Sequence, residues 1–115
     1  MELNALESEM LIDIYDADML PGMTFEIENY RLTEEDTIVK KQEFAFYLGE
    51  LKRKGFIKYE ENATFLKGGS YSTKYNNNVI MIYEDKVHID TKGIRLVESY
   101  NYSNSEIQEK TDICS

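Results

Sequence analysis

The order of elements between residues 43 and 98 constrains the fold of this chain more than any other feature. Residues 43–60, EFAFYLGELKRKGFIKYE, read as an amphipathic helix that ends at Gly55 and is followed by a strand. Residues 83–98, YEDKVHIDTKGIRLVE, read as a tight turn, a short strand and a helix capped by Thr91. A helix, a glycine stop, strands with a hairpin and a capped helix in this order predict an α+β domain.

The helix predicted over residues 40–54 has one apolar face, which we expect to lie in the core. That face carries residues at positions i, i+3, i+4 and i+7, namely Phe44, Tyr47, Leu48 and Leu51. Residues 52–54 are Lys-Arg-Lys, and cations are favourable in the last turn because the helix dipole is negative there. Gly55 suits the left-handed conformation that often follows a helix.

The N-terminal third of the chain is predicted to be acidic and mostly helical. Residues 3–18 form a helix in this interpretation, and Pro21-Gly22 ends it. Its apolar face is made of Leu3, Leu6, Met10, Leu11 and Ile14. Residues 23–32, MTFEIENYRL, could form a short strand or an irregular helix. Thr33 precedes three acids, a pattern typical of a helix N-terminus.

Residues 62–90 are predicted to be all-β. Turns are expected where Gly, Asn or charged residues cluster, at 68–69, 76–78 and 84–86. The expected strands cover residues 56–59, 64–67, 71–75, 79–83 and 87–89. This region is long for a single hairpin, and we therefore expect an enlarged antiparallel sheet.

The net charge of −9 is distributed unevenly. Residues 1–36 hold 11 acids and 1 base, whereas residues 37–98 hold 11 bases and 8 acids. An acidic arm therefore leads into a mildly basic body, and only a local basic face could attract phosphate. Cys114 is the only cysteine, which favours a reducing, cytoplasmic location. No apolar run approaches the ~20 residues that span a bilayer, so we expect no membrane association.

Two segments carry a resemblance to winged-helix domains: residues 47–57, YLGELKRKGFI, and residues 89–96, IDTKGIRL. The chain looks most like the short YjcQ-type proteins of bacteria and their prophages. The resemblance implies a winged helix with three to four helices, whose third helix reads DNA while the hairpin contacts the backbone. We expect one such domain over residues 1–100, with an acidic helical part at 1–36 and a polar tail at 101–115.

A DNA-binding regulator is the first function that the sequence suggests, in the form of a dimer. It would use the helix at 40–54 and the hairpin, with candidate contacts Lys40, Lys41, Gln42, Lys52, Arg53 and Lys74. The helix face opposite the apolar one presents Gln42, Phe46, Gly49, Glu50 and Arg53. Helices that read DNA usually carry several Arg, Lys, Asn or Gln residues there, so this face is a poor match.

A protein-interaction module on the same scaffold is the alternative function. Phe46 beside Gly49 combines an exposed aromatic ring with a position that a partner can approach closely. Leu6 and Met10 on the first helix are further candidate contacts, to a second copy or to another protein. The expected partners are therefore double-stranded DNA, a second copy of the chain or another protein.

The sequence shows no pattern typical of an enzyme or a metal protein. Asp13, Asp16 and Asp18 lack the spacing of a calcium loop, and His88 is the only histidine. No nucleophile–base constellation is visible. We therefore expect a non-enzymatic protein without catalytic residues, a metal or a small-molecule cofactor.

Overall fold

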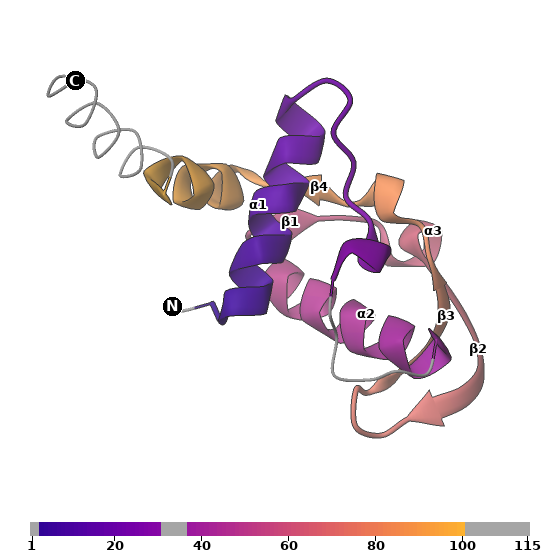
Figure 1. The fold of residues 1–115 in the computed structure, drawn as a ribbon. Helices are drawn as coiled ribbons and strands as arrows, with labels where there is room; N and C mark the ends of the chain where they lie inside the picture. Colours follow the sequence, from indigo (N-terminus) through magenta and orange to yellow (C-terminus); the bar gives the residue numbers. More distant parts are fainter. Residues whose placement is uncertain (1–2, 31–36, 101–115) are drawn as a thin grey trace, which may run out of the picture.

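The computed structural model of this protein describes residues 3–30 and 37–100. The elements follow one another as α1 (Ala5–Met19), the 3-10 helix η1 (Ile27–Asn29), α2 (Thr37–Arg53), β1 (Ile57–Lys58), α3 (Glu61–Thr64), β2 (Phe65–Ser72), β3 (Asn77–Ile82), the 3-10 helix η2 (Glu84–Lys86) and β4 (His88–Ile89). A last helix covers residues 91–100. The protein has the predicted α+β class, and the arrangement is compatible with a winged-helix-like fold (Figure 1).

The strands form two separate antiparallel pairs. In the β2–β3 hairpin, Phe65 lies opposite Ile82 and Leu66 opposite Met81. β1 pairs with the distant β4, which places Ile57 opposite Ile89. α2 lies between α1 and the hairpin, and β4 packs against α1 (Figure 1). The hairpin and the β1–β4 pair therefore cover different parts of the helical layer.

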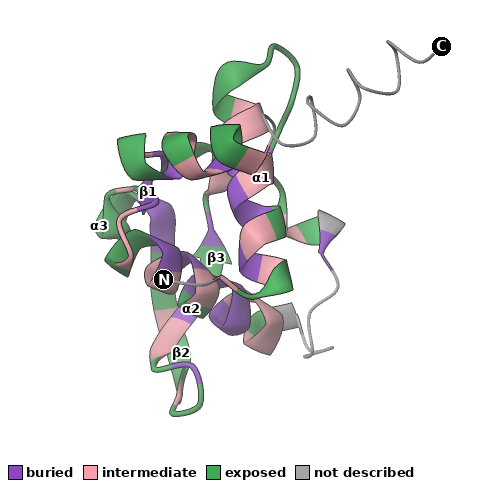
Figure 2. Ribbon diagram, turned by 90° about the vertical axis from the view of Figure 1, so that its left-hand side faces the viewer, coloured by how far each residue is buried: buried purple, intermediate pink, exposed green. Residues whose placement is uncertain are grey.

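Apolar residues from both long helices and both strand pairs meet in one core (Figure 2). Its fully buried members are Met10, Leu11, Ile14, Phe44, Leu48, Leu51, Ile57, Val79 and Val97. Phe25 and Tyr30, on the segment between the helices, each place a ring 5.5 Å from the ring of Phe44. This aromatic cluster holds the segment between the two long helices against α2.

Both long helices lie where the sequence predicts them, although not every cap does. α1 begins with a capping box that was not predicted: the Asn4 side chain accepts a 2.7 Å hydrogen bond from the Glu7 amide, and the Glu7 carboxylate accepts one from the Asn4 amide. Gly55 has a φ of +85°, which confirms the left-handed position after α2. The prediction that Thr91 caps the last helix is wrong, because that helix begins at residue 91 and the Asp90 carbonyl accepts from the Ile94 amide.

The predicted turn at 68–69 is also wrong. Gly68 and Gly69 lie inside β2, where the register with β3 shifts between Lys67 and Ser72. The left-handed φ of Gly69, +65°, accommodates this irregularity. The hairpin turn covers residues 73–76 instead of 76–78. The undecided segment at 23–32 contains η1, and the predicted cap at Thr33 and the tail at 101–115 lie outside the described residues.

Candidate functional site

A groove of about 330 Å³ opens between α2 and the β2–β3 hairpin. α2 contributes Phe46, Gly49 and Glu50, because these residues lie on the helix face opposite the buried Phe44 and Leu48. The other wall carries Tyr59, Glu61, Lys67, Tyr71 and Tyr75. We call this feature the hairpin groove.

Aromatic rings form much of the apolar wall of the hairpin groove. Phe46 is 37% exposed and Tyr71 57% exposed, whereas Tyr75 is buried. The rings of Phe46 and Tyr75 lie 6.1 Å apart, so Tyr75 supports Phe46 from the hairpin side. The Tyr71 hydroxyl donates a hydrogen bond to the side-chain oxygen of Asn76 across the turn. Contacts within the chain therefore position the exposed rings of Phe46 and Tyr71.

Gly49 and Tyr59 meet at the floor of the groove. Apart from its chain neighbours and the backbone of α2, a Cβ atom added to Gly49 would have one described neighbour within 4 Å, the Tyr59 hydroxyl at 3.9 Å. The Tyr59 hydroxyl makes no hydrogen bond to any described residue. Gly49 thus leaves room for a partner to approach the helix backbone, and Tyr59 offers that partner a hydrogen-bonding group.

The carboxylates of the groove wall are paired with bases from the same chain. Glu50 contacts Arg53 at 2.6 Å, and Glu61 contacts Lys67 at 2.8 Å. The hydrogen bond from Lys67 lowers the pKa of Glu61. The ammonium of Lys52 lies 4.5 Å from the centre of the Tyr59 ring. The walls therefore carry little uncompensated charge of either sign.

Gln42 is not available to read DNA. Its side chain is 4% exposed, and its amide donates a 3.1 Å hydrogen bond to the Ser70 carbonyl in the hairpin. The backbone carbonyl of Gln42 accepts a 3.0 Å hydrogen bond from the side-chain amide of Asn77. The prediction that Gln42 lies on the exposed face of the helix is wrong, because the hairpin folds over this part of α2.

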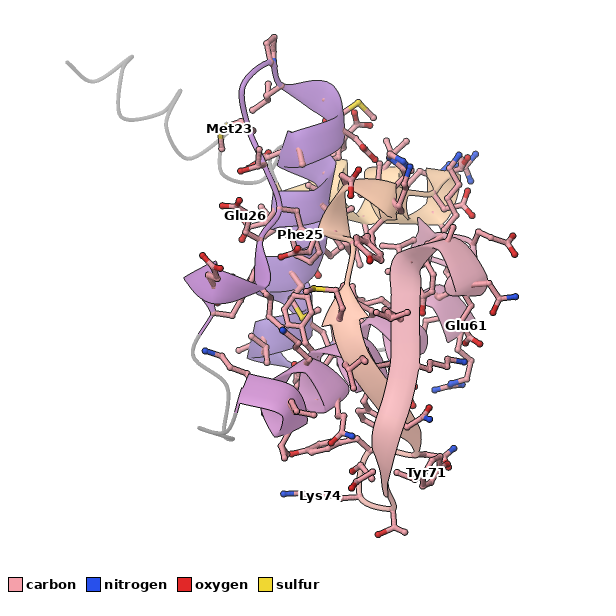
Figure 3. The ribbon with its side chains drawn as sticks, turned by 90° about the vertical axis from the view of Figure 1, so that its right-hand side faces the viewer. Met23, Phe25, Glu26, Glu61, Tyr71 and Lys74 are labelled. Atoms are coloured by element: carbon pink, nitrogen blue, oxygen red, sulfur yellow. The ribbon has the colours of Figure 1, made fainter. Side chains whose placement is uncertain are left out.

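The predicted basic residues fall into two groups. Lys40 and Lys41 are half-buried at the start of α2, which lies against the hairpin end that carries Lys74 (Figure 3). Lys52 and Arg53 lie at the other end of α2, about 18 Å away along the helix axis. The structure does not bring these five side chains into one basic surface.

The predicted protein contacts separate in a similar way. Phe46 and Gly49 both line the hairpin groove. Leu6 is half-buried against the core, and Met10 is fully buried within it. Met10 therefore cannot contact a partner in this conformation. Leu11 and Ile14 of the same predicted face are also buried in the core, and dimer formation through α1 stays a prediction.

Phe46 and Gly49 could be predicted from the sequence because both stand out on one helix face. Tyr59 could not, because it reaches the groove only through the chain reversal after Gly55. In residues 3–30 and 37–100, no three histidine, cysteine or acidic side chains gather as a metal site, and no helix has the length and apolar character needed to cross a membrane. Comparison with protein-family models, curated proteins and solved structures finds no match for the chain.

Alkaline pH is expected to destabilise the protein through three tyrosines that are buried or half-buried: Tyr30, Tyr47 and Tyr59. Burial raises the pKa of Tyr47 to about 12, and its hydrogen bond to Glu43 adds to this shift. A tyrosine whose pKa is higher folded than unfolded stabilises the fold fully below its unfolded pKa of about 10. That stabilisation is lost as pH rises towards 12. Burial also raises the pKa of Tyr30 and Tyr59.

Urea unfolding monitored from pH 9 to 12 should show a falling midpoint above pH 10. Absorbance at 295 nm should show Tyr30, Tyr47 and Tyr59 ionising after the exposed tyrosines. Ionisation of every tyrosine in one step near pH 10, with the fold intact, would contradict this expectation.

Proposed function

We propose that this protein is a cytoplasmic, non-enzymatic interaction module on a winged-helix-like scaffold, and that the hairpin groove is its docking site. The occupant is a neutral segment of a partner protein that inserts an apolar or aromatic side chain. The observation that supports this most is the open position at Gly49, between the exposed ring of Phe46 and the hydroxyl of Tyr59, which has no hydrogen-bond partner among the described residues.

The chemistry of the groove favours a neutral occupant. Its two carboxylates already face Arg53 and Lys67, so a charged partner group would have to compete with an existing ion pair. Its aromatic walls reward burial of apolar surface. A volume of about 330 Å³ is at the small end of ligand pockets, which suits one large side chain together with part of its backbone.

Selection from a random peptide library displayed on phage tests the proposal. We expect the enriched peptides to share a neutral anchor with an aromatic or branched apolar residue, and to bind in the micromolar range. Gly49→Gln would fill the groove and should weaken these peptides at least about tenfold, roughly 1.4 kcal/mol. A Cβ atom at this position meets only the Tyr59 hydroxyl, at 3.9 Å, and Gly49 has no left-handed φ, so we expect the fold to persist; urea unfolding of the variant checks this.

Gly49→Ala is the matched control, because it adds a single methyl group and should leave most of the affinity. Equal binding of the peptides to the wild-type protein and Gly49→Gln would place their site elsewhere. Failure of any peptide to be enriched over a library selected without protein would also count against the groove as a docking site.

Duplex DNA binding is the second candidate, and one observation favours it. Lys40 and Lys41 begin α2 close to the hairpin end that bears Lys74, so three bases come from neighbouring segments. Three lysines could contact the phosphate backbone, and such binding would weaken steeply with salt. The buried Gln42 and the Glu50–Arg53 pair leave the rest of the helix without base-reading side chains.

A further inference from the structure

A second cleft, of about 390 Å³, lies between the chain at the end of α1 and after it and the chain that runs from the end of β3 through η2 to the start of β4. It is lined by parts of residues 17–26 and 82–88 and shares no residue with the hairpin groove. Figure 3 shows Met23 and Glu26 on this segment, well away from Glu61 and Tyr71 of the groove. We call it the acidic cleft.

The acidic cleft has an apolar base and two exposed apolar side chains at its rim. Phe25, Ile82 and Val87 line it and are buried. Met23 is 48% exposed and Tyr83 46% exposed, although both are large apolar residues. Methionine is unbranched and flexible, so Met23 can adapt its shape to an inserted side chain.

Four carboxylates and one histidine line the same cleft. Two of these acids hold its walls together: Asp18 contacts His88 at 2.9 Å and the Ile89 amide at 2.6 Å, and Glu84 accepts a 2.6 Å hydrogen bond from the Ile27 amide. The other two, Glu26 and Asp85, have no ion-pair partner in the part of the chain that the structure describes.

Within residues 3–30 and 37–100, the charge of the acidic cleft is therefore largely uncompensated. The amides that bind Glu84 and Asp18 are neutral, and His88 is the only group of the lining that can carry positive charge. Lys86 belongs to η2 but does not line the cleft. An apolar base beneath unpaired carboxylates is complementary to an apolar side chain with cations beside it.

We propose that the acidic cleft is a second docking surface, which binds a partner segment carrying an apolar residue flanked by lysine or arginine. The apolar residue would cover Phe25 between Met23 and Tyr83, and the flanking cations would face Glu26 and Asp85. This partner differs in charge from the neutral segment proposed for the hairpin groove. Because the two surfaces share no lining residue, each can be occupied without the other.

The probe for this proposal is the acetylated, amidated hexapeptide Lys-Arg-Leu-Phe-Lys-Arg, titrated into the ¹⁵N-labelled full chain. We expect saturable shifts of backbone amides in residues 17–26 and 82–88, with Gly49 unmoved. Affinity should fall as salt rises from about 50 to 150 mM, because exposed charges are screened. Replacement of the central Leu-Phe by Ser-Ser should abolish saturation.

Two variants locate the contacts. Glu26→Gln with Asp85→Asn removes both unpaired charges and should weaken the peptide about three- to tenfold, as expected for two exposed ion pairs. Met23→Ser should weaken it through the apolar contact and leaves every charge in place. Glu9→Gln with Glu60→Gln makes the same change in net charge at exposed sites outside the cleft, and should leave binding unchanged.

Three results would overturn the proposal. Equal weakening by the Glu9 and Glu60 control would show general attraction to an acidic protein. The same amide shifts with spermidine alone would show a cation site without apolar recognition. Shifts confined to the hairpin groove, or none that saturate, would show that the cleft does not bind such a segment.

Discussion

Replacing Gly93 by alanine is expected to destabilise the protein by about 3 kcal/mol or more, and to prevent folding if the wild-type protein is only marginally stable. A Cβ atom on Gly93 would lie 2.1 Å from the carbonyl oxygen of Phe56 and 3.0 Å from a side-chain carbon of Ile89. The Phe56 oxygen accepts the Asp90 amide, so it cannot move away without loss of that hydrogen bond. The last helix would have to separate from the β1–β4 pair.

Gly49→Ala is the matched control, since Gly49 is also helical but open. It should stabilise the protein by about 0.5–1 kcal/mol, the usual gain of alanine over glycine in a helix. Urea unfolding of the two variants and the wild-type protein measures both effects. An unchanged midpoint for Gly93→Ala would show that the last helix does not pack closely on Phe56.

Phe44→Ala is expected to cost about 3–5 kcal/mol, because it removes a ring that is fully buried against Phe25 and Tyr30. Phe46→Ala, two residues further along the same helix, should cost less, about 1–2 kcal/mol, because Phe46 is 37% exposed and loses only its ring contacts with Tyr47 and Tyr75. Urea unfolding compares the stability of the two variants with that of the wild-type protein. The affinity of the Phe46 variant for the peptides selected on the hairpin groove is measured separately.

Phe46→Ala should lose most of the affinity for the peptides selected on the hairpin groove. The pair of variants therefore separates folding from docking within one helix. A larger loss of stability for Phe46→Ala than for Phe44→Ala would mean that α2 is rotated relative to the structure described here.

Local sequence signals predicted much of this fold. The spacing of Met10, Leu11 and Ile14 predicted α1, and that of Phe44, Leu48 and Leu51 predicted the buried side of α2, because helix periodicity is a property of neighbouring residues. Gly55 predicted the end of α2, because glycine readily adopts the left-handed conformation that often follows a helix. The α+β class followed from the order of these local signals.

Contacts between distant residues could not be predicted in the same way. The burial of Gln42 depends on Ser70, 28 residues further along, and the acidic cleft depends on the contact of Asp18 with His88, 70 residues further along. Gly68 and Gly69 looked like a turn because glycine signals both turns and strand irregularities. Only the pairing of β2 with β3 distinguishes the two.

The most direct test of the hairpin groove as a protein-docking site is backbone amide shift mapping of the full chain at about 150 mM salt. One sample receives a peptide selected on the wild-type protein, and another receives a 20-base-pair DNA duplex. We predict saturable shifts at Phe46, Gly49 and Tyr71 with the peptide, and no saturable shifts with the duplex. Saturable shifts at Lys40, Lys41 and Lys74 with the duplex, while the peptide leaves Gly49 unmoved, would contradict docking at this groove and favour DNA binding.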